Sequence, residues 1–285
     1  ADYVERQSGL CELALHNFPL LGLGHIRIHN RDGVSYLQEM LPVDCLFLDP
    51  ARRDGHGGKT VAISDCEPDV TVLEPLLVDK AKKVMVKLSP MLDLSLALNE
   101  LKTVRAVHIV AVNNECKELL LILQKESVSS EVSIHCEHIV GNGESRHYTF
   151  TLKREKTSPC LLADEVGTYL YEPNAAILKA GAFRSLTQTY PVAKLHLNSH
   201  LYTSVSLVPD FPGRRFRVEA VSGFGKKELK AFLMDMDKAN ITIRNFPLSV
   251  AELRKRLKLK EGGDDYIFAT TLSGGQKVLI RGKKC

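Results

Sequence analysis

The chain has 285 residues, of which 44% are hydrophobic and 25% charged, and its formal net charge is +4. This composition is typical of a soluble globular protein of about two domains. No apolar run approaches the roughly 20 residues that span a bilayer, and the first residues show no charged-then-apolar signal pattern, so nothing in the sequence points to a membrane or secreted protein. The seven cysteines include no Cys-x-x-Cys pair, which predicts a reduced, cytoplasmic protein without a disulfide framework or a zinc site.

The charge is unevenly distributed along the chain. Residues 214–285 hold 17 basic and 8 acidic side chains, a net charge of +9, whereas the preceding residues carry −5. Basic charge gathered in one segment favours a polyanionic partner, usually nucleic acid. The alternative is a charged surface that only keeps the protein soluble.

Strands and helices alternate through the first 125 residues. The predicted elements are, in chain order, a strand end over 1–5, a helix over 8–21, a strand over 25–30, a helix over 34–40, a strand over 44–49, a helix over 70–82, a strand over 83–88, a helix over 93–102 and a strand over 106–112. This order predicts an α/β fold with a mostly parallel, Rossmann-like sheet in which the strand before Asp49 is central. Segments 119–123, 131–139 and 147–153 predict an antiparallel edge with a hairpin turn at Gly141-Asn142-Gly143.

Two smaller segments follow. Residues 154–213 predict a small α+β, ferredoxin-like domain, closed by Pro209, Pro212 and Gly213. Residues 214–285 predict strands over 215–221, 241–244, 266–272 and 277–281, and helices over 226–237 and from Ser249 to near Gly262. Ser249 and Glu252 form a capping-box pattern at the start of the second helix.

Several motifs resemble one known family. Tyr3-Val4-Glu5-Arg6, Asn30-Arg31-Asp32-Gly33, Leu48-Asp49-Pro50-Ala51-Arg52 and Val86-Lys87-Leu88-Ser89-Pro90 resemble the successive strand ends of a class I S-adenosylmethionine-dependent methyltransferase. Arg244-Asn245-Phe246-Pro247-Leu248 and the segment 266–271 resemble the THUMP-like domain that ends some of these enzymes. The resemblance implies a methyltransferase domain over 1–153, the ferredoxin-like domain over 154–213 and a basic THUMP-like domain over 214–285.

The resemblance implies a binding site for the nucleoside half of S-adenosylmethionine. An acid at a strand end can accept hydrogen bonds from both ribose hydroxyls, and Glu5 corresponds to that position. Asp32, followed by Gly33, corresponds to the acceptor for the adenine amino group. The alternatives are a solvated strand end for Glu5 and a plain Asp-Gly turn for Asp32.

Asp49, Pro50 and Arg52 are the predicted catalytic residues. Asp-Pro-Ala-Arg resembles the Asp/Asn-Pro-Pro-aromatic motif, in which a side-chain oxygen and a backbone carbonyl hold the target amine for in-line attack. Here Ala51 and Arg52 replace the second proline and the aromatic residue, so base stacking is lost from the motif. Asp-Pro-Ala-Arg also resembles the Asp-Pro-Pro-Arg motif of RNA uracil-C5 methyltransferases. However, Ser89 stands near the position of the nucleophilic cysteine of those enzymes, so covalent chemistry is not supported.

Several basic residues each have two possible interpretations. Arg52, Arg53 and Lys59 suit a phosphate or carboxylate, or form a surface charge run. Lys87 is interpreted as a snorkelling side chain in preference to an active-site cation. The predicted RNA contacts in the tail are Lys226, Lys227, Arg244, Arg254, Arg256 and Lys258. Their alternative is a solvated helix face.

The leading hypothesis is a cytoplasmic methyltransferase that acts on a base of tRNA or rRNA, with no metal, since alternation along a strand would separate His135 and Glu137 from Cys136 and His138. The family's glycine-rich turn, which holds the methionine half of the cofactor, is not found before Glu5. We therefore expect an amino-terminally truncated chain that is inactive by itself. The alternative hypothesis is a non-catalytic RNA-binding or scaffold protein that keeps the fold.

Overall fold

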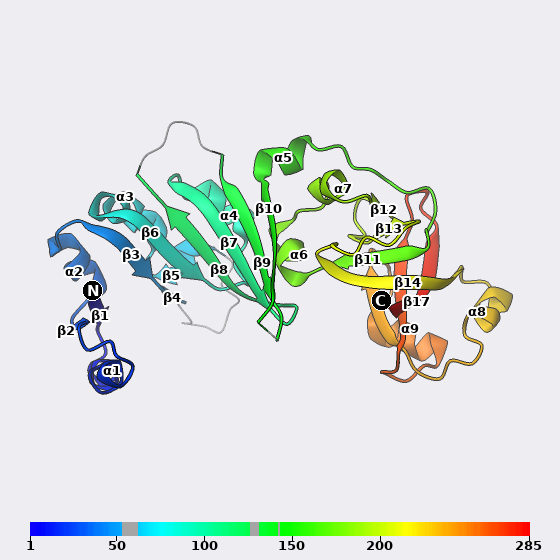
Figure 1. Ribbon diagram of the computed structural model, residues 1–285, viewed down its shortest axis with the longest axis horizontal. Coiled ribbons are helices and arrows are strands. Elements are labelled where there is room, and N and C mark those ends of the chain that lie inside the picture. The colour runs from blue at the N-terminus through cyan, green and yellow to red at the C-terminus, as the bar shows by residue number, and fades with distance from the viewer. Residues whose placement is uncertain (53–61, 126–130, 142) are drawn as a thin grey trace. The chain divides into compact units, whose positions relative to one another are not determined.

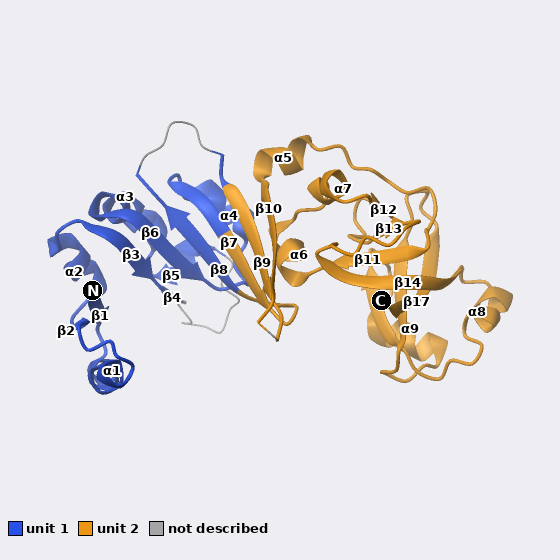
Figure 2. Cartoon of the chain, in the orientation of Figure 1, with its two compact units in different colours: residues 1–107, 118–132 blue, residues 108–117, 133–285 orange. Residues whose placement is uncertain are grey.

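The computed structural model describes residues 1–52, 62–125, 131–141 and 143–285, and the chain forms two compact units (Figures 1 and 2). Unit 1 comprises Ala1–Val107 and Glu118–Val132, and unit 2 comprises His108–Lys117 and Ser133–Cys285. Strands β7 (Val104–Val112) and β8 (Glu115–Leu123) therefore contribute residues to both units. Arg53, Lys59 and Asn142, together with the side chain of Arg52, lie outside the described residues.

Unit 1 combines parallel strand pairs with helices. Its other strands are β1 (Asp2–Glu5), β2 (Arg27–Asn30), β3 (Val43–Leu48), β4 (Ala51–Arg52), β5 (Cys66–Glu67) and β6 (Ala81–Leu88). Its helices are α1 (Ser8–Leu20), α2 (Gly33–Glu39), the 3-10 turn η1 (Ile63–Asp65), α3 (Val70–Lys80) and α4 (Leu94–Glu100). The pairs β1·β2 and β3·β6 are parallel, β6·β8 is antiparallel, and the main strand order is β7-β8-β6-β3. The predicted α/β class is confirmed.

Strand β6 shows why the sheet has one buried face. Successive strand residues point to opposite faces, and Val84, Val86 and Leu88 are buried beneath α3, while Lys83 and Lys87 point the other way. Strand β3 is the last strand in this order within the described part of the chain, and its Phe47 is 58% exposed. The prediction that the strand before Asp49 is central is therefore wrong. An unbroken apolar run does not reveal whether a strand has a neighbour on each side.

Unit 2 contains two sheets. The first has the order β10-β9-β7, and the second has the order β12-β13-β11-β14-β17-β16-β15. The strands not yet given are β9 (Ser133–Ile139), β10 (Ser145–Thr151), β11 (Tyr169–Pro173), β12 (Ala193–Lys194), β13 (Tyr202–Ser204), β14 (Gly213–Ser222), β15 (Asn240–Arg244), β16 (Asp265–Thr271) and β17 (Lys277–Lys284). The helices are α5 (Leu152–Thr157), α6 (Ala175–Ala180), α7 (Ser185–Thr189), α8 (Lys226–Phe232) and α9 (Val250–Leu257). No helix in the described ranges is both long and apolar enough to cross a membrane.

The predicted antiparallel edge is confirmed by β9 and β10, which pair with Ser145 opposite Ile139. In the larger sheet, β11 and β14 pair directly, so strands from the predicted ferredoxin-like and THUMP-like segments share one sheet. Gly213 allows this approach, because a Cβ atom at that position would lie 2.0 Å from the backbone oxygen of Glu172.

Strand β16 separates two hydrophobic clusters. Phe268 packs with Phe216 on one face of the sheet, whereas Ile267 and Ala269 pack on the other face with residues of α8 and α9. The capping box of Ser249 and Glu252 is present at α9. However, this helix ends at Leu257, well before Gly262, because the chain turns into a left-handed conformation at the next residue, where φ is 56°.

The stability of unit 2 is expected to depend on pH through His200. Its ring stacks on Phe183 at 3.6 Å, and burial, followed by the charges of Lys194 and Arg244, lowers its pKa to about 4. The unfolded chain binds a proton here near pH 6.5, but the folded chain does not, so stability is lost as the pH falls from about 6.5 towards 4. We expect a loss of about 1–2 kcal/mol between pH 7 and pH 5, measured by urea unfolding.

His200→Asn should remove most of this difference between pH 7 and pH 5. Asparagine tolerates the left-handed backbone at this position, where φ is 52°, and it does not titrate in this range. His25→Asn, at an exposed histidine of unit 1, serves as the control and should leave the difference unchanged. An equal pH dependence in the His200 variant and the wild type would contradict the assignment.

Candidate functional site

Acidic side chains gather at the carboxyl ends of the parallel strands of unit 1. Glu5 ends β1, Asp32 follows β2, and Asp49 follows β3. Glu5 pairs in register with Asn30, the last residue of β2. Because the carboxyl ends of paired parallel strands meet at one edge, the ends of β1 and β2 bring Glu5 and Asp32 together, whereas Asp49 lies at the corresponding end of the β3·β6 pair.

Glu5 is half-buried and its carboxylate is oriented locally. Its Oε1 accepts a hydrogen bond of 2.7 Å from the backbone N–H of Gln7. Its backbone oxygen accepts one of 3.0 Å from Nδ2 of Asn30. These contacts join the ends of β1 and β2 and, among the described residues, leave Oε2 of Glu5 available to a ligand hydroxyl.

Asp32 is the N-cap of α2, and Gly33 is the first residue of that helix. Its Oδ2 accepts hydrogen bonds from the backbone N–H and the hydroxyl of Ser35, at 2.8 and 2.9 Å. These bonds, with a smaller contribution from the charge of Arg6, lower the pKa of Asp32. The Asp-Gly pair therefore starts a helix, and the capping bond holds the carboxylate in one orientation.

A chain of contacts leads from Glu5 towards Asp49. Arg6 forms an ion pair of 3.1 Å with Glu67, and Glu67 pairs with Ala51 in the β4·β5 ladder. Ala51 is two residues beyond Asp49 in the predicted catalytic motif. These contacts link the end of β1 to the segment after Asp49, and the carboxylates of Glu5 and Asp32 have the acceptor chemistry that the nucleoside half of the implied cofactor requires.

Asp49 is paired with a lysine of the neighbouring strand. Its Oδ2 lies 2.8 Å from Nζ of Lys87, and a carboxylate oxygen of Glu118 lies 3.8 Å from the same nitrogen. The hydrogen bond to Asp49 raises the pKa of Lys87, which keeps the ammonium charged. The ammonium of Lys87 therefore faces Asp49 at the predicted site, and whether it acts there as a cation stays a prediction. Parallel pairing of β3 and β6 produces the contact, since Asp49 and Lys87 each follow a paired residue.

The residues after Asp49 form a bend. Pro50 is buried, and Ala51 and Arg52 turn away into β4, where their backbones pair with β5. Asp49 itself stays half-exposed at the bend. The predicted roles of Pro50 and Arg52 remain predictions.

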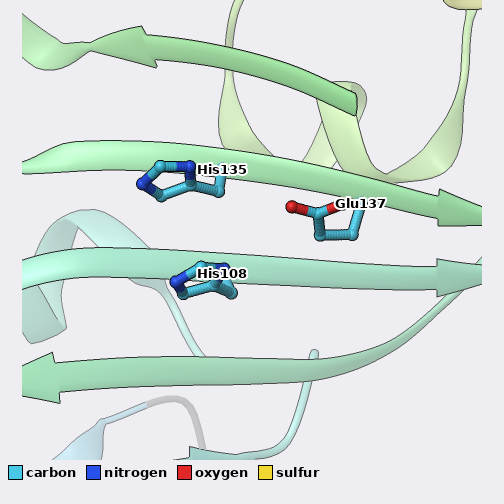
Figure 3. Close-up of side chains that lie close together, drawn as sticks. All are labelled: His108, His135 and Glu137. Atoms are coloured by element: carbon cyan, nitrogen blue, oxygen red, sulfur yellow. The ribbon is translucent and has the colours of Figure 1, made fainter. Parts of the chain in front are cut away.

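A second cluster lies on the β10-β9-β7 sheet of unit 2 (Figure 3). Potential ligand atoms of His108, His135 and Glu137 lie within 4.8 Å of one another, and such donors suit zinc. The two imidazoles are stacked at 4.6 Å with an angle of 11° between their planes, so their in-plane lone pairs run nearly parallel instead of converging. Glu137 also contacts His147. We assign no metal to this cluster.

The predicted RNA-contacting residues differ in their surroundings. Arg244 is ion-paired with the buried Glu172 at 2.9 Å, and Arg254 donates to the backbone oxygens of Ala239 and Lys260. The remaining four are exposed, namely Lys226, Lys227, Arg256 and Lys258. Sequence reasoning did not single out Lys277, which faces the same pocket as Arg256.

Comparison with known protein families defines the class of unit 2. Residues 169–212 match a ferredoxin-like domain family, and residues 213–284 match a family described as THUMP domain-like. The basic end of the chain is therefore a THUMP-like domain, as the resemblance implied. No curated protein matches the chain significantly.

A solved structure covers the whole chain. The crystal structure of a candidate methyltransferase from Porphyromonas gingivalis W83 is 36% identical, matches 100% of this chain and 71% of its own, and superposes with a TM-score of 0.88. At this identity and coverage the two proteins are homologous, and the chain belongs to this methyltransferase family.

Proposed function

We propose that this protein is a cytoplasmic, S-adenosylmethionine-dependent methyltransferase that modifies a base in tRNA or rRNA. The observation that carries the proposal is the placement of Asp49 at the carboxyl end of β3, where Lys87 holds it, in a chain whose parallel strands β1 and β2 also end at acidic residues, Glu5 and Asp32. The relative from Porphyromonas gingivalis supports methyl transfer as the reaction class. Seven free cysteines are compatible with a reducing compartment.

Asp49 orients the group that receives the methyl. Its Oδ2 is held by Lys87, and Oδ1 accepts a hydrogen bond from the target amine, which turns the nitrogen lone pair towards the methyl group. Methyl transfer requires in-line placement more than acid or base chemistry, and fixed orientation is the main contribution of such a side chain. Glu118, beyond Lys87, balances the ammonium charge at this edge.

Glu5 and Asp32 hold the nucleoside half of the cofactor. Glu5 accepts from the ribose hydroxyls, and Asp32, with Gly33 following it, accepts from the adenine amino group. When bound, S-adenosylmethionine supplies an electrophilic methyl group. These residues fix the position of the nucleoside. The contact with Gln7 already orients the carboxylate of Glu5, and the helix cap already orients that of Asp32.

The THUMP-like match and the +9 charge of residues 214–285 support RNA as the substrate. The exposed residues Lys226, Lys227, Arg256 and Lys258 would contact phosphates, which makes binding salt-dependent. The alternative is a non-catalytic RNA-binding scaffold. It is favoured by the fact that Asp32 and Asp49 each already have a protein partner.

Titration of S-adenosylhomocysteine into the protein tests the cofactor site. Glu5→Gln is expected to weaken binding by roughly 10- to 100-fold, the usual effect of losing hydrogen bonds to a charged acceptor. The amide oxygen of glutamine still accepts from Gln7, so the fold should be kept. Calorimetry measures the affinity.

Glu12→Gln is the matched control, because Glu12 is an exposed acid on α1 a few residues away. It should bind S-adenosylhomocysteine like the wild type. Equal affinity of both variants would remove Glu5 from the cofactor site. No binding by the folded wild-type protein, nor by a form extended through the family's glycine-rich turn, would favour the scaffold instead.

A further inference from the structure

The THUMP-like domain contains a pocket of about 350 Å³. It is lined by Phe224, Phe246, Pro247, Leu248, Arg256 and Lys277. These residues come from the turn before α8, the connection between β15 and α9, the last turn of α9, and the start of β17. The domain fold therefore builds the pocket from four separate segments.

The floor of the pocket is aromatic and fixed. The rings of Phe224 and Phe246 stack at 5.4 Å with 27° between their planes. Both rings are half-buried and pack, with Leu248, against the cluster that includes Leu253 and Ile267. An aromatic pair supported in this way offers a flat surface at low entropic cost, which suits stacking of another planar ring.

The connection that carries Phe246 is anchored on both sides. Asn245 adopts a positive φ of 53° at the end of β15. Its backbone oxygen accepts from the hydroxyl of Thr271 at 2.7 Å, and its side chain bonds His196 at 3.0 Å. The position of Phe246 is thus set by the sheet before any ligand arrives.

Two cations border this aromatic surface. The guanidinium of Arg256 lies over the ring of Phe224 at 5.3 Å, and Lys277 is exposed at the rim. Within the described part of the chain neither forms an ion pair, whereas the acids nearby are engaged in helix caps, Glu228 with Gly225 and Glu252 with Ser249. The pocket therefore presents positive charge beside a planar apolar surface.

We propose that this pocket binds one unpaired nucleotide of the RNA substrate, with the base stacked on Phe246 or Phe224 and its phosphate held by Arg256 and Lys277. The inference rests on the proposed RNA substrate and specifies how the THUMP-like domain recognises it. The pocket is near the lower limit of small-ligand sites, about 300–1,000 Å³. A base in a duplex, or in a compact loop whose bases are all stacked, does not expose its face, so an unpaired end, bulge or open loop is selected.

The test measures binding of the full chain to two fluorescently labelled RNAs, a single-stranded decamer and a blunt hairpin closed by a stable loop. Phe246→Leu keeps an apolar side chain but removes the ring. It should weaken binding of the decamer about fivefold to a hundredfold, the range for one base stack. Arg256→Gln should weaken binding and lower the salt dependence of the affinity by about one phosphate contact.

Lys255→Gln is the matched control, since Lys255 is an exposed neighbour of Arg256 on α9 that does not line the pocket. Lys277→Gln, at the exposed rim, provides a second test that does not disturb the core. The pocket would be overturned if Phe246→Leu, Arg256→Gln and Lys277→Gln all bound the decamer as tightly as the control. In that case the proposed function would still stand if the protein bound the hairpin and transferred methyl groups. Absence of binding to both RNAs by the wild type, or preference for an acidic aromatic peptide, would overturn the pocket and the RNA substrate together.

Discussion

In a form of the protein that also carries the family's glycine-rich turn, replacing Asp49 by alanine is expected to lower the rate of methyl transfer by at least about a hundredfold to a thousandfold, the usual effect of removing one preorganised polar group. The affinity for S-adenosylhomocysteine should change less than about twofold, because Asp49 does not contact the nucleoside in the proposed site. Single-turnover transfer of a radiolabelled methyl group to RNA measures the first quantity, and calorimetry measures the second.

The loss is large because Asp49 has two tasks in the proposed site. Its carboxylate would hold the target amine, and it also holds the ammonium of Lys87 at 2.8 Å. Alanine removes both contacts and leaves Lys87 with the more distant Glu118, at 3.8 Å. Asp49→Asn should recover part of the rate, because the amide oxygen still accepts a hydrogen bond from an amine.

The chain offers a matched control on the same two strands. Asp44 and Lys82 form an ion pair of 2.7 Å at the opposite end of β3 and β6, and both side chains are exposed. Asp44→Ala therefore removes the same kind of cross-strand pair without reaching the site, and it should leave the rate unchanged. If both alanine variants transferred methyl groups at the wild-type rate, Asp49 would have no part in the reaction.

The features that could be predicted from the sequence are local. The capping box joins Ser249 to Glu252, three residues apart, and it is present as predicted. The strand predicted over 266–272 is present as β16, Asp265–Thr271. In both cases the interacting groups are fixed by backbone geometry over a few residues, which is why pattern analysis succeeds.

The features that could not be predicted depend on strand pairing. Lys87 meets Asp49 only because β3 and β6 lie in register, and the pocket at Phe246 is assembled from four segments. Arg244 was predicted to contact RNA from its place in a basic stretch. Its ion pair joins it to Glu172, 72 residues earlier, and no spacing rule indicates a partner at such a distance.

Glu172→Ala is expected to destabilise unit 2 by about 3–5 kcal/mol, the usual cost of breaking a buried ion pair by removing one partner. Glu172 is 2% exposed and accepts from two arginines. Arg214 donates from Nε at 2.8 Å and also from Nη2, and Arg244 donates at 2.9 Å. Urea unfolding measures the loss of free energy.

The two arginines that remain, and not only the lost carboxylate, cause the expected destabilisation. Both arginine side chains are about two-thirds buried, and without Glu172 neither has another ion pair in the described part of the chain to offset the desolvation of its charge. Glu219→Ala is the control, because Glu219 pairs with Arg281 and Lys283 nearer the surface and should cost less than about 1 kcal/mol. Similar losses in the two variants would show that the Glu172 pair does not stabilise the sheet. A much larger loss of stability in Glu172→Ala than in Glu219→Ala would mean that the Glu172 ion pairs, including that of Arg244, support the fold. Weaker RNA binding by Arg244→Ala would then have to be interpreted together with the stability of that variant.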